Sequence, residues 1–212
     1  MALILHGYRY SVYLRIARLA LAEKGVACER VEVNPFAPDR PEAYLALHPF
    51  GRVPALDHDG FVLYETAAIT RYIDRAFDGP ALQPTTPQAL ARMDQIIAVV
   101  DSYGYWPMVR QVFSQRVFRA RVGTIVDEAE VARGLEASAK VLAAFEALAG
   151  EATFLVGPEV SLADLHLGAM MAYFTQAPEG TALLAQYPRL FRWWWQLASH
   201  PSMVATDPGL PE

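Results

Sequence analysis

A proline-rich stretch divides the chain into two parts that cannot share one run of secondary structure. Residues 78–87 contain three prolines and one glycine. Proline lacks a backbone N–H and its ring clashes with the preceding turn, so neither a helix nor a central strand runs through such a stretch. We therefore predict two domains, residues 1–78 and residues 88–212, joined by a linker at residues 79–87.

The first part alternates between strand and helix patterns. Ser11 is a good N-cap for a helix in which apolar residues recur at helical spacing, and Gly25 ends that pattern. His58-Asp59-Gly60 is a hairpin signal. The resulting β-α-β-α-β-β-α order predicts a mixed sheet with helices packed on it. The expected elements are strand 2–5, helix 12–24, strand 31–33, helix 41–47, strands 53–56 and 61–63, and helix 65–77.

Only helices are expected after the linker, so the fold class is an α/β N-terminal domain followed by an all-α C-terminal domain. Ser161 and Asp164 fit a capping box, in which two side chains satisfy the free N–H groups at a helix start. The predicted helices cover residues 88–112, 126–149, 161–176 and 188–199, with a less regular helical pattern over 113–124.

The composition excludes several classes of protein. Hydrophobic residues make up 53% of the chain, which is too many for a disordered protein. No apolar stretch reaches the ~18 residues of a membrane span, and the first residues do not read as a signal peptide, so a cytoplasmic protein is expected. A net charge of −5 without a basic tract argues against a nucleic-acid partner. A single cysteine, with no paired His or Cys at ligand spacing, argues against a structural metal site.

Four short motifs follow one another in a specific order. They are Ser11-Val12-Tyr13-Leu14-Arg15, then His48-Pro49-Phe50-Gly51-Arg52-Val53-Pro54-Ala55-Leu56, then Glu65-Thr66, and finally Ser161-Leu162-Ala163-Asp164. Over essentially the whole chain this pattern resembles the cytosolic glutathione transferases, specifically a serine-type, bacterial-like member. The resemblance implies a thioredoxin-like glutathione-binding domain, a helical domain, a homodimer and a role in detoxification.

Ser11 is the predicted catalytic residue. A free thiol has a pKa of about 8.5, and the partial positive charge and free N–H groups of a helix start favour its anion. A hydroxyl at that place donates a hydrogen bond to the sulfur, which is the role that the resemblance implies for Ser11. The alternative is that Ser11 only caps the helix. Tyr10, and after it Tyr8, are the rival partners of the thiol.

The resemblance also implies a set of groups that hold glutathione, the co-substrate. The Val53-Pro54 bond is expected to be cis, with the Val53 backbone pairing with the cysteinyl part of glutathione; the alternative is a trans proline at a strand edge. Glu65 is expected to bind the γ-glutamyl ammonium. The Thr66 hydroxyl and the helix start are expected to bind its carboxylate. The alternative is that Glu65 and Thr66 are only an ordinary acid and a cap at the start of a helix.

The remaining site residues are less determined by the motifs. Arg40 or Arg52 is the candidate for binding the glycine carboxylate, although surface arginines are usually only solvated. Tyr10, Tyr103 and Trp106 are candidates for an apolar pocket that holds the electrophile. Aromatic residues at helical spacing more often belong to a core, and that interpretation stays open for Tyr103 and Trp106.

The leading hypothesis is therefore an enzyme in which the protein activates the glutathione thiol for attack on a small apolar electrophile. A glutathione-dependent isomerase or peroxidase is one alternative. A non-catalytic binding or scaffold protein of the same fold is another, and the presence of Ser11, Glu65 and Thr66 together argues against it.

Overall fold

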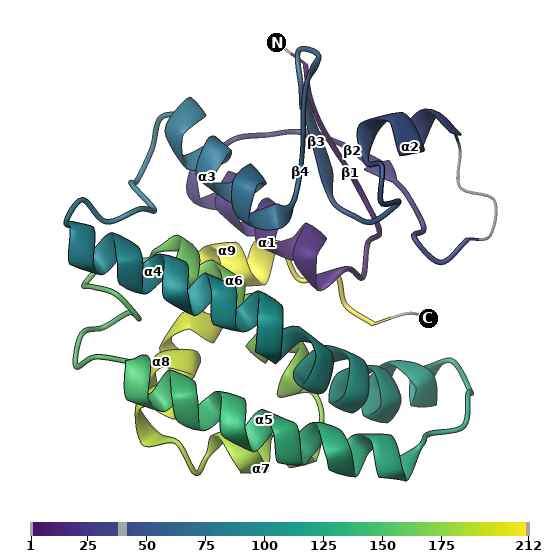
Figure 1. Ribbon diagram of the computed structural model, residues 1–212, viewed down its shortest axis with the longest axis vertical. Helices are drawn as coiled ribbons and strands as arrows, with labels where there is room; N and C mark the ends of the chain where they lie inside the picture. Colours follow the sequence, from purple (N-terminus) through teal and green to yellow (C-terminus); the bar gives the residue numbers. More distant parts are fainter. Residues whose placement is uncertain (1, 38–41, 211–212) are drawn as a thin grey trace. The chain divides into compact units, whose positions relative to one another are not determined.

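The computed structural model of the protein describes residues 2–37 and 42–210, which form two units (Figure 1). The first unit comprises the chain up to Ala81 together with Ala205–Pro208, and the second begins at Leu82. Residues 205–208, which the sequence pattern assigns to the helical part, thus belong to the α/β unit.

A four-stranded mixed sheet forms the centre of the first unit. Its order is β2-β1-β3-β4, with β1 parallel to β2 and antiparallel to β3, and with β3 antiparallel to β4. The hairpin turn is made by Asp59 and Gly60, whose φ angles of 52° and 89° are those that a tight β-hairpin requires. The strands are β1 (Leu3–Gly7), β2 (Glu29–Glu32), β3 (Ala55–His58) and β4 (Phe61–Tyr64).

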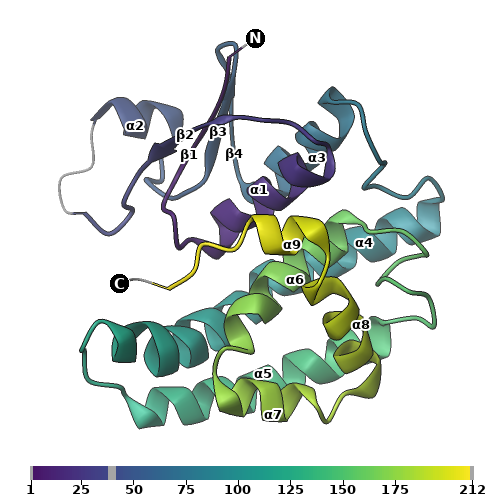
Figure 2. The same cartoon turned by 180° about the vertical axis from the view of Figure 1, so that it is seen from behind.

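Helices lie on both faces of this sheet (Figures 1 and 2). Side chains alternate along β1, so Leu3 and Leu5 are buried on the face covered by α1 (Val12–Glu23) and α3 (Thr66–Ala76). The opposite face carries α2 (Glu42–Leu47), whose only buried side chain, Tyr44, packs with Val33 and Ala55. The predicted mixed sheet and its covering helices are confirmed.

The N-terminus of α1 is built as the sequence predicts. Ser11 is the N-cap, and its Oγ accepts a hydrogen bond from the Leu14 N–H at 3.3 Å. Gly25 follows the helix with a φ of 65°, a conformation in which a side chain is disfavoured.

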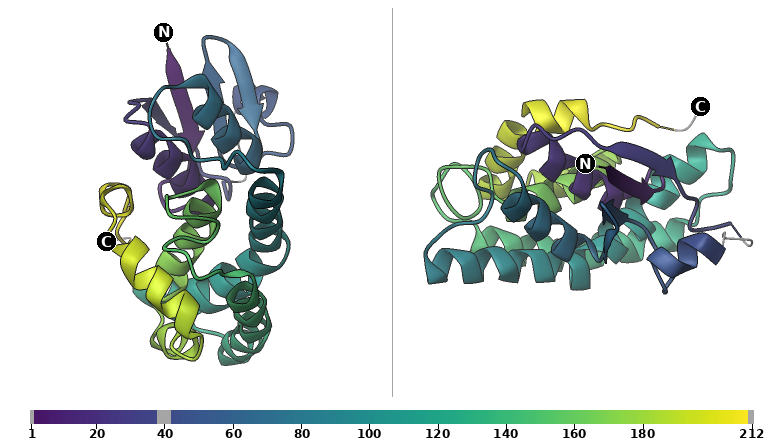
Figure 3. Two further views of the ribbon diagram at one scale, coloured as in Figure 1. Left: turned by 90° about the vertical axis from the view of Figure 1, so that its left-hand side faces the viewer. Right: turned by 90° about the horizontal axis from the view of Figure 1, so that it is seen from above.

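In the helical unit, α6 (Leu162–Phe174) is buried on almost all sides. In the left view of Figure 3, α6 in light green lies between α4 (Pro87–Val99) in dark teal and α8 (Pro188–Ala198) in yellow. The further helices are α5 (Glu128–Leu148), α7 (Pro178–Leu184) and α9 (Pro201–Ala205). No helix in the described ranges has both the length and the apolar character that crossing a membrane demands.

The helical unit departs from the sequence prediction in two respects. The predicted single α-helix over residues 88–112 becomes π-helical at η1 (Val100–Gly104) and continues as η2 (Trp106–Arg119). The prediction also missed α7 and α9, two short helices that each begin with a proline. Proline at the first helical position is a known start signal, because its missing N–H would be unpaired there anyway.

Candidate functional site

The sheet topology brings three predicted site groups to one end of the first unit. Ser11 follows the C-terminal end of β1, and His6 of β1 pairs with Ala55 at the start of β3. Val53-Pro54 leads directly into that start. Ala55 also pairs with Tyr64, the last residue of β4, and Glu65 comes next. Ser11, Val53-Pro54 and Glu65 therefore all lie in the segments that flank the strands at the same end of the sheet.

Ser11 is half-buried and held by a tight turn. Its N–H donates to the Tyr8 carbonyl at 2.8 Å, and its Oγ accepts from the Leu14 N–H. A hydroxyl has one donor and two acceptor lone pairs, so the capping bond leaves its proton for another partner. The two interpretations of Ser11, as a cap and as a sulfur partner, are therefore compatible.

The Val53-Pro54 peptide bond is cis, which confirms the prediction. Within the described residues, the backbone N–H and C=O of Val53 carry no hydrogen bond. Val53 is half-buried and follows the exposed Arg52. An unpaired donor and acceptor on one residue are what an extended peptide needs for pairing.

Glu65 has an uncommon backbone conformation. Its φ is 70°, and it is the N-cap of α3, where its carbonyl accepts the N–H groups of Ala68 and Ile69 at 3.0 Å each. Its carboxylate makes no capping bond and its side chain is exposed. Outside turns, a non-glycine residue held at positive φ costs about 1–3 kcal/mol, and such residues cluster at functional sites. The next residue, Thr66, begins α3 and is buried.

His48 is a site feature that the sequence interpretation did not single out. Its side chain is 3% exposed, and its ring centroid lies 4.9 Å from that of Tyr64, next to Glu65. Burial lowers the pKa of His48, and the charge of Glu65 opposes that shift. The imidazole is thus neutral near pH 7 and lies against Tyr64, the residue before Glu65. The sequence signal that could have identified His48 is its position as the first residue of the motif that leads to Val53-Pro54.

Of the two arginine candidates, Arg52 is among the described residues. Arg52 is exposed, and its carbonyl accepts the Tyr44 hydroxyl, which ties this residue to α2. Arg40 lies outside the described residues.

An aromatic group stands beside Ser11. Tyr8 meets Tyr10 edge to face at 5.6 Å between ring centroids, and it meets Phe36 in the same manner at 6.0 Å. Phe36 is 65% exposed and was not predicted. Burial raises the pKa of Tyr8, which keeps its phenol neutral.

Tyr103 and Trp106 lie on η1 and η2 of the helical unit. They are 66% and 60% exposed, so they are not core residues of that unit. The core interpretation of these two side chains is therefore wrong, and their role in an electrophile pocket stays a prediction.

Cys28 precedes β2 and is half-buried. Burial raises the pKa of its thiol, and the nearby charges of Arg30 and Arg18 only partly oppose this. A thiol with a raised pKa is a poor nucleophile near neutral pH.

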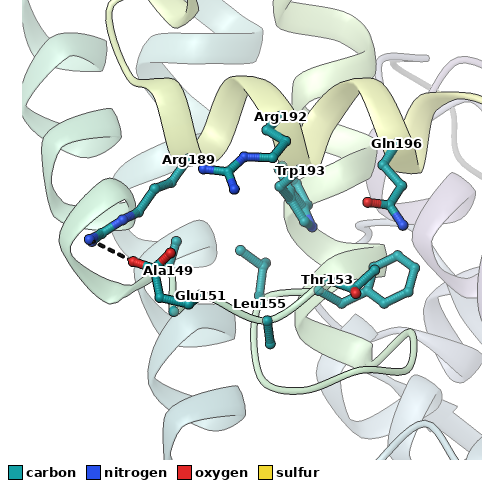
Figure 4. Close-up of a pocket in the computed structure, with 11 residues that line it drawn as sticks. Ala149, Glu151, Thr153, Leu155, Arg189, Arg192, Trp193 and Gln196 are labelled. Atoms are coloured by element: carbon teal, nitrogen blue, oxygen red, sulfur yellow. Dashed lines mark ion pairs between the residues drawn. The ribbon is translucent and has the colours of Figure 1, made fainter.

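The helical unit contains a cavity of its own (Figure 4). It has a volume of about 190 Å³ and lies between α8 and residues 149–155. Figure 4 shows Arg189 paired with Glu151, at 2.9 Å, on its rim. The Trp193 indole N–H donates to Asp164 Oδ1 at 2.8 Å behind it. None of the predicted site residues lines this cavity.

Comparisons with known proteins agree with this arrangement. Residues 5–81 match the glutathione S-transferase N-terminal domain family, and residues 105–201 match the C-terminal domain family. Glutathione S-transferase F13 of Arabidopsis thaliana is 31% identical over 99% of this chain and 97% of its own.

Solved structures show the same likeness. The apo structure of glutathione S-transferase III is 30% identical and superposes with a TM-score of 0.87, covering 100% of this chain and 98% of its own. Glutathione S-transferase I bound with lactoylglutathione is 27% identical with a TM-score of 0.83, covering 97% and 98%. Since matches of this extent run over both units, the chain belongs to the glutathione S-transferase family.

Proposed function

We propose that this protein transfers the glutathione thiolate to an electrophilic carbon of a small apolar substrate, with Ser11 donating a hydrogen bond to the sulfur. The observation that carries the proposal is the convergence of Ser11, Val53 and Glu65 at one end of the sheet. The kinship to glutathione S-transferases, one of them solved with lactoylglutathione bound, supports the choice of thiol.

Activation of the thiol rests on the start of α1. The partial positive charge at a helix N-terminus favours the thiolate. The Leu14 N–H that donates to Ser11 Oγ also polarises the hydroxyl and strengthens it as a donor. The sulfur then attacks the electrophilic carbon, the leaving group departs with its electron pair, and the thiol proton goes to solvent. The protein forms no covalent bond.

The other groups of glutathione are each assigned to a residue of complementary charge or hydrogen-bonding capacity. The exposed Glu65 carboxylate binds the γ-glutamyl ammonium, and Thr66 with the start of α3 binds the carboxylate. The Val53 N–H and C=O pair with the cysteinyl backbone. Arg52 binds the glycine carboxylate, and Arg40 is the other candidate.

The second substrate is expected to be apolar. Tyr10, with Tyr8 and Phe36, offers an aromatic surface beside Ser11. Tyr103 and Trp106 are exposed and complete the proposed set from the helical unit. A homodimer and a cytoplasmic location belong to the same proposal, on the strength of the family kinship.

The first test is a calorimetric titration with glutathione. Glu65→Ala removes a charge-assisted hydrogen bond of ~1.5–3 kcal/mol, so binding should weaken about 10- to 100-fold. Glu42→Ala is the matched control, because Glu42, like the N-cap Glu65, is an exposed acid at the start of a helix of the same unit. A folded wild-type protein that binds no glutathione would refute the proposal and favour a scaffold or apolar-ligand binder of this fold.

The second test addresses Ser11. Ser11→Ala should raise the apparent pKa of bound glutathione by about one to two units, which is the equivalent of a hydrogen bond to a charged sulfur. The pH–rate profile with a chromogenic aryl halide reports this pKa. An unchanged profile would exclude the role of Ser11, and Tyr10→Phe would then be the next variant.

A further inference from the structure

The chain returns to the α/β unit near its C-terminal end. We name residues Thr206–Pro208 the C-terminal strap. Arg18 of α1 donates to the Thr206 carbonyl at 3.0 Å, and Arg9 donates to the Pro208 carbonyl at 3.0 Å. Each bond joins positions more than 180 residues apart in the sequence. The strap is thus fastened to the α/β unit at two places.

Arg9 lies within the loop that ends at Ser11, and it is held from three directions. Its backbone N–H donates to Glu32 Oε1 at 2.9 Å, and its guanidinium reaches the strap. The same guanidinium lies 5.4 Å from the ring centroid of Tyr10, a cation–π distance. The Tyr8 carbonyl accepts the Ser11 N–H, so Arg9 and Tyr10 are the two central residues of the turn that leads to Ser11.

The loop has little packing support on the side of the strap. A hollow of about 500 Å³ lies there, lined by Leu5, Gly7, Leu14 and Arg18 of β1 and α1 and, on the side of the strap, by Pro208. Where side chains do not fill the space behind a loop, its position depends on the few polar bonds that cross the gap. Arg9 makes two such bonds, one to β2 and one to the strap.

We propose that Arg9 is a positioning residue for Ser11 and that the C-terminal strap is its anchor. Arg9 acts through the loop and touches no reacting atom. The inference rests on the proposed role of Ser11 as the hydrogen-bond donor to the sulfur. Because a small misplacement of such a donor is costly, loosening Arg9 should impair thiol activation more than glutathione binding.

The kinetic test uses Arg9→Met, with Arg30→Met as its matched control. Arg30 lines the same hollow, but its side chain makes no hydrogen bond or ion pair with the described residues. Arg9→Met should lower kcat about tenfold and raise the apparent pKa of bound glutathione by about one unit. Its Kd for glutathione should change less than about threefold, because Val53 and Glu65 are untouched. Arg9→Lys should restore most of kcat, since an ammonium also donates to a carbonyl.

A second measurement does not depend on activity. Hydrogen exchange of the amides of residues 8–14 should be about fivefold faster in Arg9→Met than in wild type. If Arg9→Met does not fold, Arg18→Met releases the strap at Thr206 instead and should speed exchange in the same segment.

The outcomes separate the two proposals. Unchanged exchange over residues 8–14 in a folded variant overturns the role of Arg9 and the strap, as does a kcat and pKa equal to those of wild type. An equal effect of Arg30→Met also overturns the role of Arg9, since the loss of a positive charge near the hollow would then be the cause. A wild-type protein that does not use glutathione refutes the proposed function, and the exchange measurement still decides about the strap.

Discussion

Replacing Asp164 tests how the helical unit is held together. This carboxylate is completely buried and accepts four hydrogen bonds. Oδ1 accepts from the Leu155 N–H at 2.9 Å and from the Trp193 indole at 2.8 Å. Oδ2 accepts from the N–H and the hydroxyl of Ser161 at 2.9 and 2.6 Å. Asp164→Ala removes all four bonds and leaves at least three N–H donors without this acceptor.

The size of the effect follows from those bonds. At a net ~1–1.5 kcal/mol for each hydrogen bond, four lost bonds amount to about 4–6 kcal/mol. The variant no longer buries a charge, which offsets a part of this. We expect a net loss of about 3–5 kcal/mol, or roughly 8–15 °C in Tm for a chain of this size.

Asp164→Asn is the matched variant, because it keeps the shape and one acceptor. With its oxygen in the place of Oδ1, the amide nitrogen faces Ser161, whose hydroxyl can rotate to accept but whose N–H cannot. The expected cost is therefore about half of that of Asp164→Ala, from one orphaned N–H group.

The assays are urea unfolding and thermal melting, each followed by circular dichroism, with tryptophan fluorescence as a second probe. The Kd for glutathione should stay within about twofold of wild type in both variants. The reasoning is refuted if Asp164→Ala melts within about 2 °C of wild type. It is also refuted if the folded variant loses glutathione binding, since Asp164 would then belong to the site.

Three further predictions concern single features. Lys24→Met should lower the free energy of unfolding in urea by about 3–5 kcal/mol, because it removes the ammonium that lies 3.1 Å from the buried Asp74 carboxylate. A second substitution in that variant, Asp74→Leu, should recover most of the loss. Gly180→Ala should destabilise by about 3 kcal/mol, since its Cβ would lie 2.2 Å from the Phe174 carbonyl oxygen and the backbone must move; a Tm equal to wild type contradicts this. Burial lowers the pKa of His48, so the unfolded chain binds the extra proton first and stability falls as the pH drops below about 6.5. The Tm of His48→Gln should therefore fall less than that of wild type when the pH is lowered from neutral to mildly acidic. If the Tm of both proteins falls equally with pH, this histidine is excluded as the cause.

The elements that the sequence predicted best are those with local signals at both ends. Ser11 and Gly25 bracket α1, and Asp59-Gly60 turns the hairpin, because each of these residues suits its own backbone conformation regardless of distant contacts. The same holds for Val53-Pro54, where the motif predicted the observed cis bond.

Other features depend on contacts that no local pattern records. An apolar repeat does not distinguish an α-helix from the π-helical course that begins at Val100, because both bury one face. The return of residues 205–208 to the α/β unit depends on Arg9 and Arg18, far away in the sequence. His48 lies at the site because its ring contacts that of Tyr64, which is distant in the sequence.

The burial of α6 has a consequence for handling the protein. Twelve of its thirteen residues are buried, so unfolding exposes one contiguous apolar segment to solvent. Such segments associate between chains faster than large proteins refold. Heating should therefore end in precipitation, with a yield of recovered protein that falls as the concentration rises. A mutation that loosens α6 should first appear as a loss of soluble expression, before any loss of chemistry at Ser11.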